Sequence, residues 1–157
     1  MEIETTRFGV IQYREEDVLT FPDGLLGFPN SRRYIIIDVG GSVAFKWMQS
    51  LDQPELAFIV VRPGYFRTDY NPHISDDDRK ALQLDSQDEI ACFAIVSVPR
   101  DPERMTANLR GPLVVNLSKR IGRQVVLTDE RYTTRHPIID EYRALASRSV
   151  QPTSNAS

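Results

Sequence analysis

Short runs of apolar residues, or of alternating apolar and polar residues, recur along the 157 residues of this chain. Each run is closed by turn residues, as at Phe21–Pro29, Gly40–Gly41 and Lys119–Gly122, which is typical of strands in an antiparallel sandwich or barrel. The expected strands are 10–13, 18–21, 34–39, 45–51, 56–61, 90–98, 113–117 and 124–127. The pattern therefore predicts a mainly β fold, a small antiparallel β-barrel with one or two short helices.

The run Ile90–Val98 is apolar on both of its faces. In an extended strand Cys92, Ala94, Val96 and Val98 lie on one face, and Phe93 and Ile95 lie on the other. This pattern indicates a central strand that is covered on both sides.

Two segments have helical patterns. Ser75 followed three positions later by Asp78 resembles a capping box at a helix start, and apolar residues recur at helical spacing over Ile138–Leu145. Beyond Ala146 the sequence is small and polar, so we expect a single domain over residues 1–146 and a disordered polar tail over residues 147–157.

Cysteine content and the absence of long apolar runs indicate the compartment. Cys92 is the only cysteine, so no disulfide closes within the chain, and a buried thiol suits a reducing compartment. The N-terminus shows no basic segment followed by an apolar one, and no run approaches the roughly 20 apolar residues of a membrane helix. We therefore expect a cytoplasmic protein without membrane partners.

Acidic residues gather in one part of the chain, which has a net charge of −3. Between residues 65 and 90 acids outnumber bases, whereas bases outnumber acids between residues 99 and 148. Because phosphate contacts supply most nucleic-acid affinity, an acidic domain is a poor unaided binder of RNA. The candidate partner-binding acidic face consists of Asp69, Asp76, Asp77, Asp78, Asp85, Asp88 and Glu89.

The run Asp76–Asp78 has a second interpretation. Acids in the first turn of a helix each stabilise it by roughly 0.3–1 kcal/mol through the helix dipole. A calcium-binding loop is a third interpretation of this run, but its spacing lacks the alternating aspartates and the glycine that such loops use. The dipole role and the partner-binding role stay open for this run.

The segment Phe21–Pro29 places apolar side chains where the backbone must turn. Leu25, Leu26 and Phe28 stand around Gly24 and Gly27. Such a loop either plugs one end of a barrel or exposes an apolar contact patch.

The sequence contains no recognisable catalytic or metal-binding motif. It lacks a Gly-x-Ser-x-Gly elbow, a phosphate-binding glycine loop and a His-Glu-x-x-His signature. His73 and His136 are far apart in sequence, and Cys92 lies among apolar residues that raise a thiol pKa. We therefore predict a binding protein and not an enzyme, with no metal, cofactor or small-molecule substrate.

Several blocks, in this order, resemble a known family. They are Thr6–Gly9, Phe21–Phe28, Trp47–Leu51, Ala57–Val60, Asp69–Tyr70, Thr106–Asn116, Gly122–Leu127 and Tyr132–Ile138. Together they are similar to the bacterial flagellar assembly factor FliW over roughly residues 2 to 140. The most specific block is Asn-Leu-x-x-Pro-x-x-x-Asn from Asn108 to Asn116, and Gly111 stands where the family is expected to have alanine.

The resemblance implies a small antiparallel β-barrel and two protein partners. One is the carbon storage regulator CsrA, a dimeric RNA-binding protein that represses flagellin translation, and the other is flagellin itself. Free flagellin would capture the factor, and export of flagellin would release it to inhibit CsrA. Among the motif residues, Gln49, Asn108 and Asn116 are interpreted as structural.

The charge pattern suggests how such inhibition would work. An acidic domain docked beside an RNA-binding surface attracts the basic repressor and repels RNA through the same field. The alternative function is a barrel that binds RNA directly through Arg100–Arg123 and exposed aromatic residues.

Overall fold

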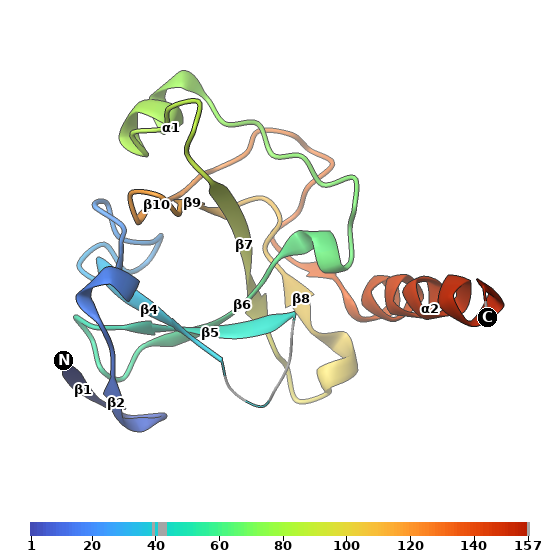
Figure 1. Cartoon of the computed structure of the whole chain (residues 1–157), viewed down its shortest axis with the longest axis horizontal. Helices are drawn as coiled ribbons and strands as arrows, with labels where there is room; N and C mark the ends of the chain where they lie inside the picture. The colour runs from blue at the N-terminus through green and yellow to red at the C-terminus, as the bar shows by residue number, and fades with distance from the viewer. Residues whose placement is uncertain (39, 41–43, 157) are drawn as a thin grey trace.

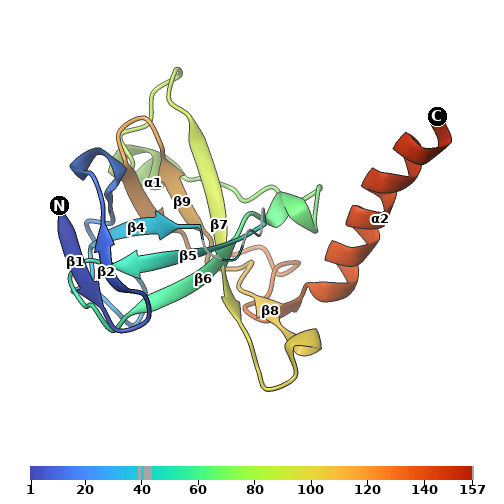
Figure 2. The same ribbon diagram turned by 60° about the horizontal axis from the view of Figure 1, so that its bottom comes forward.

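Seven strands of the described chain close into a barrel (Figures 1 and 2). The computed structural model describes residues 1–38, 40 and 44–156. In ring order the strands are β3 (Leu19–Thr20), β4 (Arg33–Ile37), β5 (Phe45–Ser50), β6 (Ala57–Val61), β7 (Ile90–Ser97), β9 (Leu113–Asn116) and β10 (Ile121–Gln124). All neighbours in the ring pair antiparallel except β10 and β3, which pair in parallel at Ile121 and Thr20. The predicted mainly β barrel is confirmed, with one parallel contact that the sequence pattern did not indicate.

Two further pairs of short strands and several helical turns lie outside the ring. One pair forms a separate hairpin at the N-terminus, and the other extends the edge of β7. The strands are β1 (Glu2–Thr5), β2 (Gly9–Gln12), β8 (Thr106–Ala107) and β11 (His136–Pro137). The 3-10 turns are Glu15–Asp17, Pro63–Tyr65 and Pro102–Arg104. The sequence pattern indicated β2 but neither β1 nor the two-residue strands β8 and β11.

The prediction of a strand over residues 124–127 was wrong. The strand is β10, Ile121–Gln124, and the turn that precedes it occupies residues 117–120. Gly122 was interpreted as a turn residue, but it lies inside β10, where a Cβ would come within 2.4 Å of the Phe21 ring. The glycine is therefore required by side-chain packing in the barrel, which the local sequence does not reveal.

The barrel interior is filled by one cluster of apolar side chains. Phe21, Tyr34 and Met48 are its largest fully buried members, and the rings of Phe21 and Tyr34 meet edge to face at 5.5 Å. Ala91 and Phe93 of β7 also belong to this cluster.

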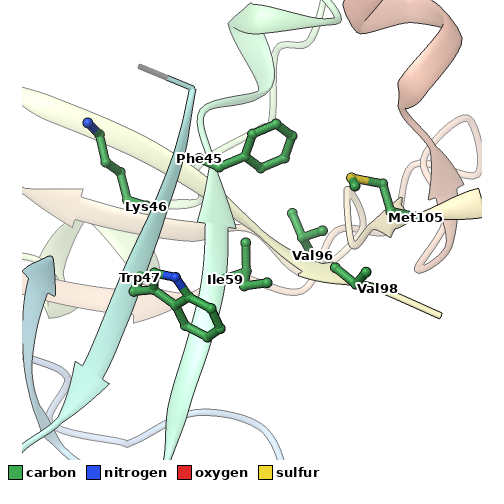
Figure 3. A pocket seen from close by; sticks show the side chains of 7 residues that line it. All are labelled: Phe45, Lys46, Trp47, Ile59, Val96, Val98 and Met105. Carbon is green, nitrogen blue, oxygen red and sulfur yellow. The ribbon is translucent and has the colours of Figure 1, made fainter. Parts of the chain in front are cut away.

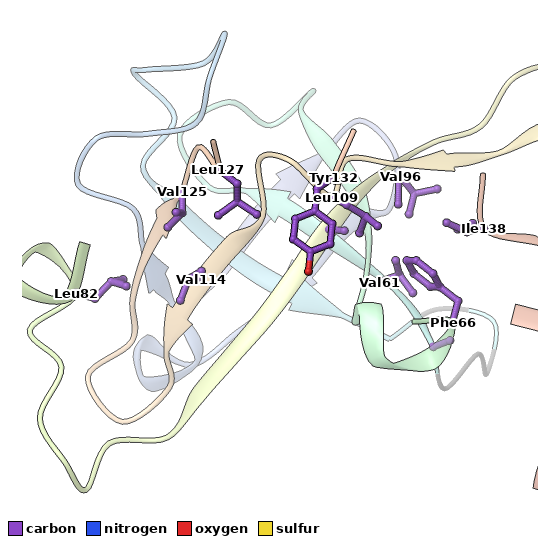
Figure 4. Packing of buried hydrophobic residues seen from close by; sticks show 13 residues of the cluster. Val61, Phe66, Leu82, Val96, Leu109, Val114, Val125, Leu127, Tyr132 and Ile138 are labelled. Atoms are coloured by element: carbon purple, nitrogen blue, oxygen red, sulfur yellow. The ribbon is translucent and has the colours of Figure 1, made fainter. Parts of the chain in front are cut away.

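A second apolar cluster lies on the outside of the barrel wall (Figure 4). Ala94 and Val96 of β7 pack there against Phe66, Tyr132 and Ile138 from the connecting segments. The middle of strand β7 is thus covered on both faces, as predicted, whereas Ile90 and Val98 at the ends of the run are each 46% exposed. Strand predictions for the other runs fall within one or two residues of the observed strands, except that Val39, in the expected strand 34–39, lies outside the described residues.

Two helices lie in the described chain, α1 (Asp76–Ala81) and α2 (Ile139–Ala156). Helix α1 begins after Ser75, as predicted. The prediction of short helices was wrong for α2, which has 18 residues. Its helical backbone continues past Ala146, the position after which the sequence predicts a disordered tail. The side chains of residues 148–157 lie outside the described part of the chain, and the division into a domain over 1–146 and a tail stays a prediction. No helix among the described residues is long and apolar enough to cross a membrane.

Candidate functional site

The three aspartates at the start of helix α1 are of two kinds. Asp78 completes a capping box: its backbone N–H donates to Ser75 Oγ at 3.1 Å, and its carboxylate accepts from the Ser75 backbone N–H at 3.3 Å. Asp76 and Asp77 are exposed, and their carboxylates form no ion pair with a described residue. Only Asp76 and Asp77 of this run therefore present free charge to a partner.

Arg123 of β10 connects α1 to the loop that follows β3. Its Nε lies 3.4 Å from Asp78 Oδ1, and its side chain also donates to the Asp77 carbonyl. The same arginine lines a hollow with Leu25 and Leu26 of the loop. The fold thus brings together two candidates that the sequence placed about 50 residues apart.

The acids that follow α1 are held by a single lysine. Lys119 Nζ lies 3.0 Å from Oδ2 of Asp85 and 3.0 Å from Oδ2 of Asp88. The Lys119 hydrogen bond is the main reason that the pKa of Asp88 is lowered, helped by bonds from Asp85 N–H and Asn116. Glu89 is exposed and has no ion pair with a described residue, although its backbone N–H donates to Ser118.

Asp69 lies apart from the other six acids. It accepts hydrogen bonds from Arg67, whose guanidinium is also 3.9 Å from Glu141 in α2. Beside α2 the residues Asp69, Asp140 and Glu141 line another hollow, whereas α1 lies at the far side of the barrel (Figure 1). The structure therefore does not place Asp69 on the same face as the α1 acids.

The acidic end around α1 is less negative than its aspartates suggest. Arg79, Lys80, Lys119 and Arg123 lie among its six carboxylates. The free carboxylates there are Asp76, Asp77 and Glu89, and their role in partner binding stays a prediction.

The loop Phe21–Pro29 directs its apolar side chains both into the barrel and toward solvent. Leu25 is buried in the barrel interior, whereas Leu26 is 65% exposed and Phe28 packs edge to face on Phe58 at 5.3 Å. Gly24 has φ +66°, and a Cβ there would lie 2.6 Å from the Phe28 carbonyl oxygen. The turn therefore directs one leucine inward and its neighbour outward, beside Arg123 and Gln124.

Gln49 is fully buried and ties a turn to the barrel. Its Nε2 donates to the carbonyls of Ser50, Pro54 and Leu56 at 2.9 to 3.1 Å. These three bonds hold the β5–β6 connection and support the predicted structural role.

The two asparagines of the specific motif also bond to backbone. Asn108 Oδ1 accepts from the N–H groups of Arg110 and Gly111, which forms a tight turn. Asn116 is fully buried and donates to the Leu82 carbonyl and to Asp88. Their contacts support a structural role for both, and Asn116 couples β9 to the end of α1.

The residues with chemical reactivity do not converge in the described chain. It contains no group of three or more His, Cys, Asp or Glu side chains that would hold a metal ion. Burial raises the pKa of the Cys92 thiol to about 12, and His136 bonds to Glu141 and stacks on Phe66. This arrangement offers no nucleophile with a base beside it.

Local sequence patterns did not indicate the cations that neutralise the acids. Lys119 and Arg123 were grouped with a separate basic region, because their pairing with residues about 30 to 45 positions earlier depends on the β9–β10 hairpin. No local signal marks such long-range partners.

Comparisons with known proteins identify relatives over most of the chain. A family model described as FliW protein matches residues 2–138. The flagellar assembly factor FliW of Bdellovibrio bacteriovorus is 42% identical over 151 residues, which cover 96% of this chain and 85% of that protein. The flagellar assembly factor FliW of Caldanaerobacter subterraneus is 38% identical over 144 residues, which cover 91% of this chain and 96% of that protein.

A solved structure has the same fold. The crystal structure of a flagellar assembly factor FliW superposes with a TM-score of 0.80 and 29% sequence identity. The match covers 87% of this chain and 96% of that one.

Proposed function

The chain belongs to the FliW family of flagellar assembly factors, and on that premise we propose that it controls flagellin synthesis by binding two proteins, the translational repressor CsrA and flagellin. Bound to CsrA, it relieves repression of flagellin translation. Bound to flagellin, it acts as a chaperone-like partner and leaves CsrA active. This exchange takes place in the cytoplasm and involves no catalysed reaction.

The observation that carries the proposal is the family match over residues 2–138 together with the shared barrel. The free carboxylates Asp76, Asp77 and Glu89 support contact with a basic repressor, because an RNA-binding surface must be positive. Exposed Leu26 lines a hollow with Arg123, whose side chain donates to the Asp77 carbonyl, and so offers an apolar contact beside this part of α1. Mixed charged and apolar contacts of this kind are common in protein interfaces.

Purified components test the proposal directly. We expect the chain to bind purified CsrA from the same bacterium, to release a flagellin leader RNA from CsrA, and to lose this effect when flagellin is added. Calorimetry and an RNA mobility-shift assay measure these steps. Absence of binding to both CsrA and flagellin would refute the proposal.

Direct RNA binding is the alternative function, and the same assay addresses it. The chain without CsrA is titrated with single-stranded RNA over a range of salt concentrations. Tight binding with a steep salt dependence would favour the alternative.

A further inference from the structure

An apolar groove crosses the outer face of β5, β6 and β7 (Figure 3). Its apolar lining consists of Phe45, Trp47, Ile59, Val96, Val98 and Met105. The N-terminal hairpin meets one end, where Phe8 packs on Trp47, and α2 meets the other, where Tyr142 packs on Phe45. On the side of the groove away from β5, Val98 is 46% exposed, although the solvent face of an antiparallel sheet normally carries polar side chains.

A basic hollow continues the groove past Val98. Val98 lines both, and Arg100, Arg104 and Arg135 line the hollow. All three arginines are exposed, and their side chains form no ion pair or hydrogen bond with a described residue. The carboxylate of Asp101, which also lines the hollow, accepts a hydrogen bond from the Glu103 N–H.

What sets these arginines apart is that three guanidinium groups unpaired with any described residue line one hollow. Arg67, Lys119, Arg123, Arg131 and Arg143 each hold a carboxylate of the same chain. Three unpaired guanidinium groups at one place attract anions strongly, because like charges held together create a local positive potential.

We propose that the groove and the hollow together dock an acidic amphipathic peptide segment of a partner protein. Apolar side chains of the segment would fill the groove beside Trp47 and Val98. Its carboxylates would pair with Arg100, Arg104 and Arg135, because the planar guanidinium matches a carboxylate with two parallel hydrogen bonds.

A peptide fits this surface better than RNA does. A phosphate backbone would satisfy the arginines but would leave the apolar groove uncovered. One face of Trp47 is also occupied, since the guanidinium carbon of Arg7 lies 4.5 Å from the ring centre. The strand β5 and the β8 end of β7, whose residues line the site, lie away from α1 (Figure 1). The site takes a partner of the opposite charge from the one expected at α1.

Trp47 gives a direct readout of occupancy. It is the only tryptophan of the chain, and it lines the groove. The probe is a synthetic amphipathic peptide of leucine and glutamate without aromatic residues, and tryptophan emission is recorded during its titration. We expect a saturable change in emission, and binding about tenfold or more weaker in the variant Arg100→Gln/Arg104→Gln/Arg135→Gln. The variant Val98→Ser should also bind more weakly.

Matched controls separate the site from general charge attraction. Arg32, Arg79 and Lys80 are exposed, and their side chains form no ion pair with a described residue, so the variant Arg32→Gln/Arg79→Gln/Lys80→Gln removes the same charge elsewhere. Val126→Ser changes an exposed valine outside the groove. Both should bind like the original chain, and circular dichroism melting checks that every variant is folded.

Three outcomes would overturn the proposal. They are equal binding of a leucine–lysine peptide, an equal loss in the control triple variant, and tighter binding of single-stranded RNA that depends on the same three arginines. The measurement uses neither CsrA nor flagellin. A failed peptide titration would therefore not contradict the proposed function. In the same way, a failure to bind CsrA and flagellin would not contradict peptide binding in the groove.

Discussion

Lys119 Nζ lies 3.0 Å from Oδ2 of Asp88, and this pair joins the β9–β10 turn to the segment that follows α1. The hydrogen bond from Lys119 is the main cause of the lowered pKa of Asp88. A carboxyl whose pKa is lower in the folded state stabilises the fold at a pH above its unfolded pKa. That contribution is lost as the pH falls through the folded pKa.

We therefore predict that the stability of the chain falls more steeply on acidification than that of Asp88→Asn. The urea midpoint, measured by circular dichroism from about pH 6 down to about pH 3, checks this. Asparagine keeps an acceptor for Asn116 but does not titrate. Parallel curves for the two proteins would contradict the prediction.

Gly122→Ala should destabilise the barrel by about 1–3 kcal/mol, because the new methyl group overpacks the interior. Its Cβ would lie 2.4 Å from the Phe21 ring, which is fully buried and has little room to move. Urea unfolding measures the loss. Gly64→Ala is the matched control, since nothing lies within 4 Å of a Cβ there, and an equal effect of both changes would refute the explanation.

Gln49→Met keeps most of the side-chain volume but removes three hydrogen bonds to backbone carbonyls. The Pro54 and Leu56 carbonyls keep the backbone N–H donors of Thr6 and Ser50. A lost hydrogen bond costs about 0.5–1.5 kcal/mol, so we expect a loss of at least about 1 kcal/mol of unfolding free energy. Gln87→Met, at an exposed position, is the matched control and should change the free energy of unfolding little. A stability equal to that of the original chain would show that the bonds are not needed.

Asp76→Asn/Asp77→Asn and Asp78→Ala should have different effects. The first variant removes free charges and should weaken CsrA binding while making the remaining binding less sensitive to salt. The second breaks the capping box and the pair with Arg123, and should lower stability by about 1 kcal/mol. Calorimetric titration and urea unfolding measure the two effects. Unchanged affinity with lost helix stability in the first variant would leave only the dipole role for these aspartates.

The Cys92 thiol should react slowly with a disulfide reagent at pH 8. Burial raises its pKa to about 12, so very little reactive thiolate is present, and the folded chain also shields the sulfur. We expect the rate measured by absorbance to rise by orders of magnitude in unfolding concentrations of urea. Fast reaction of the folded chain would show that the strand around Cys92 opens readily.

Local patterns in the sequence were enough to predict the fold class and most strands. Alternation of apolar and polar residues indicates strands because successive side chains point to opposite faces, and the Ser75–Asp78 spacing indicates the start of α1 because capping is local. These local patterns could not place β10. Gly122 looks like a turn residue in the sequence, but it lies inside the strand because the ring of Phe21, about 100 residues earlier, leaves no room for a side chain there.

The sequence by itself determined the barrel, the start of α1 and the family, because each rests on spacing within one segment or on ordered motif blocks. Only the tertiary structure decided which charges are free. Lys119 and Arg123 neutralise acids far away in the sequence, whereas Arg100, Arg104 and Arg135 gather without a described partner. Charge pairing depends on distance in space, and folding alone sets that distance.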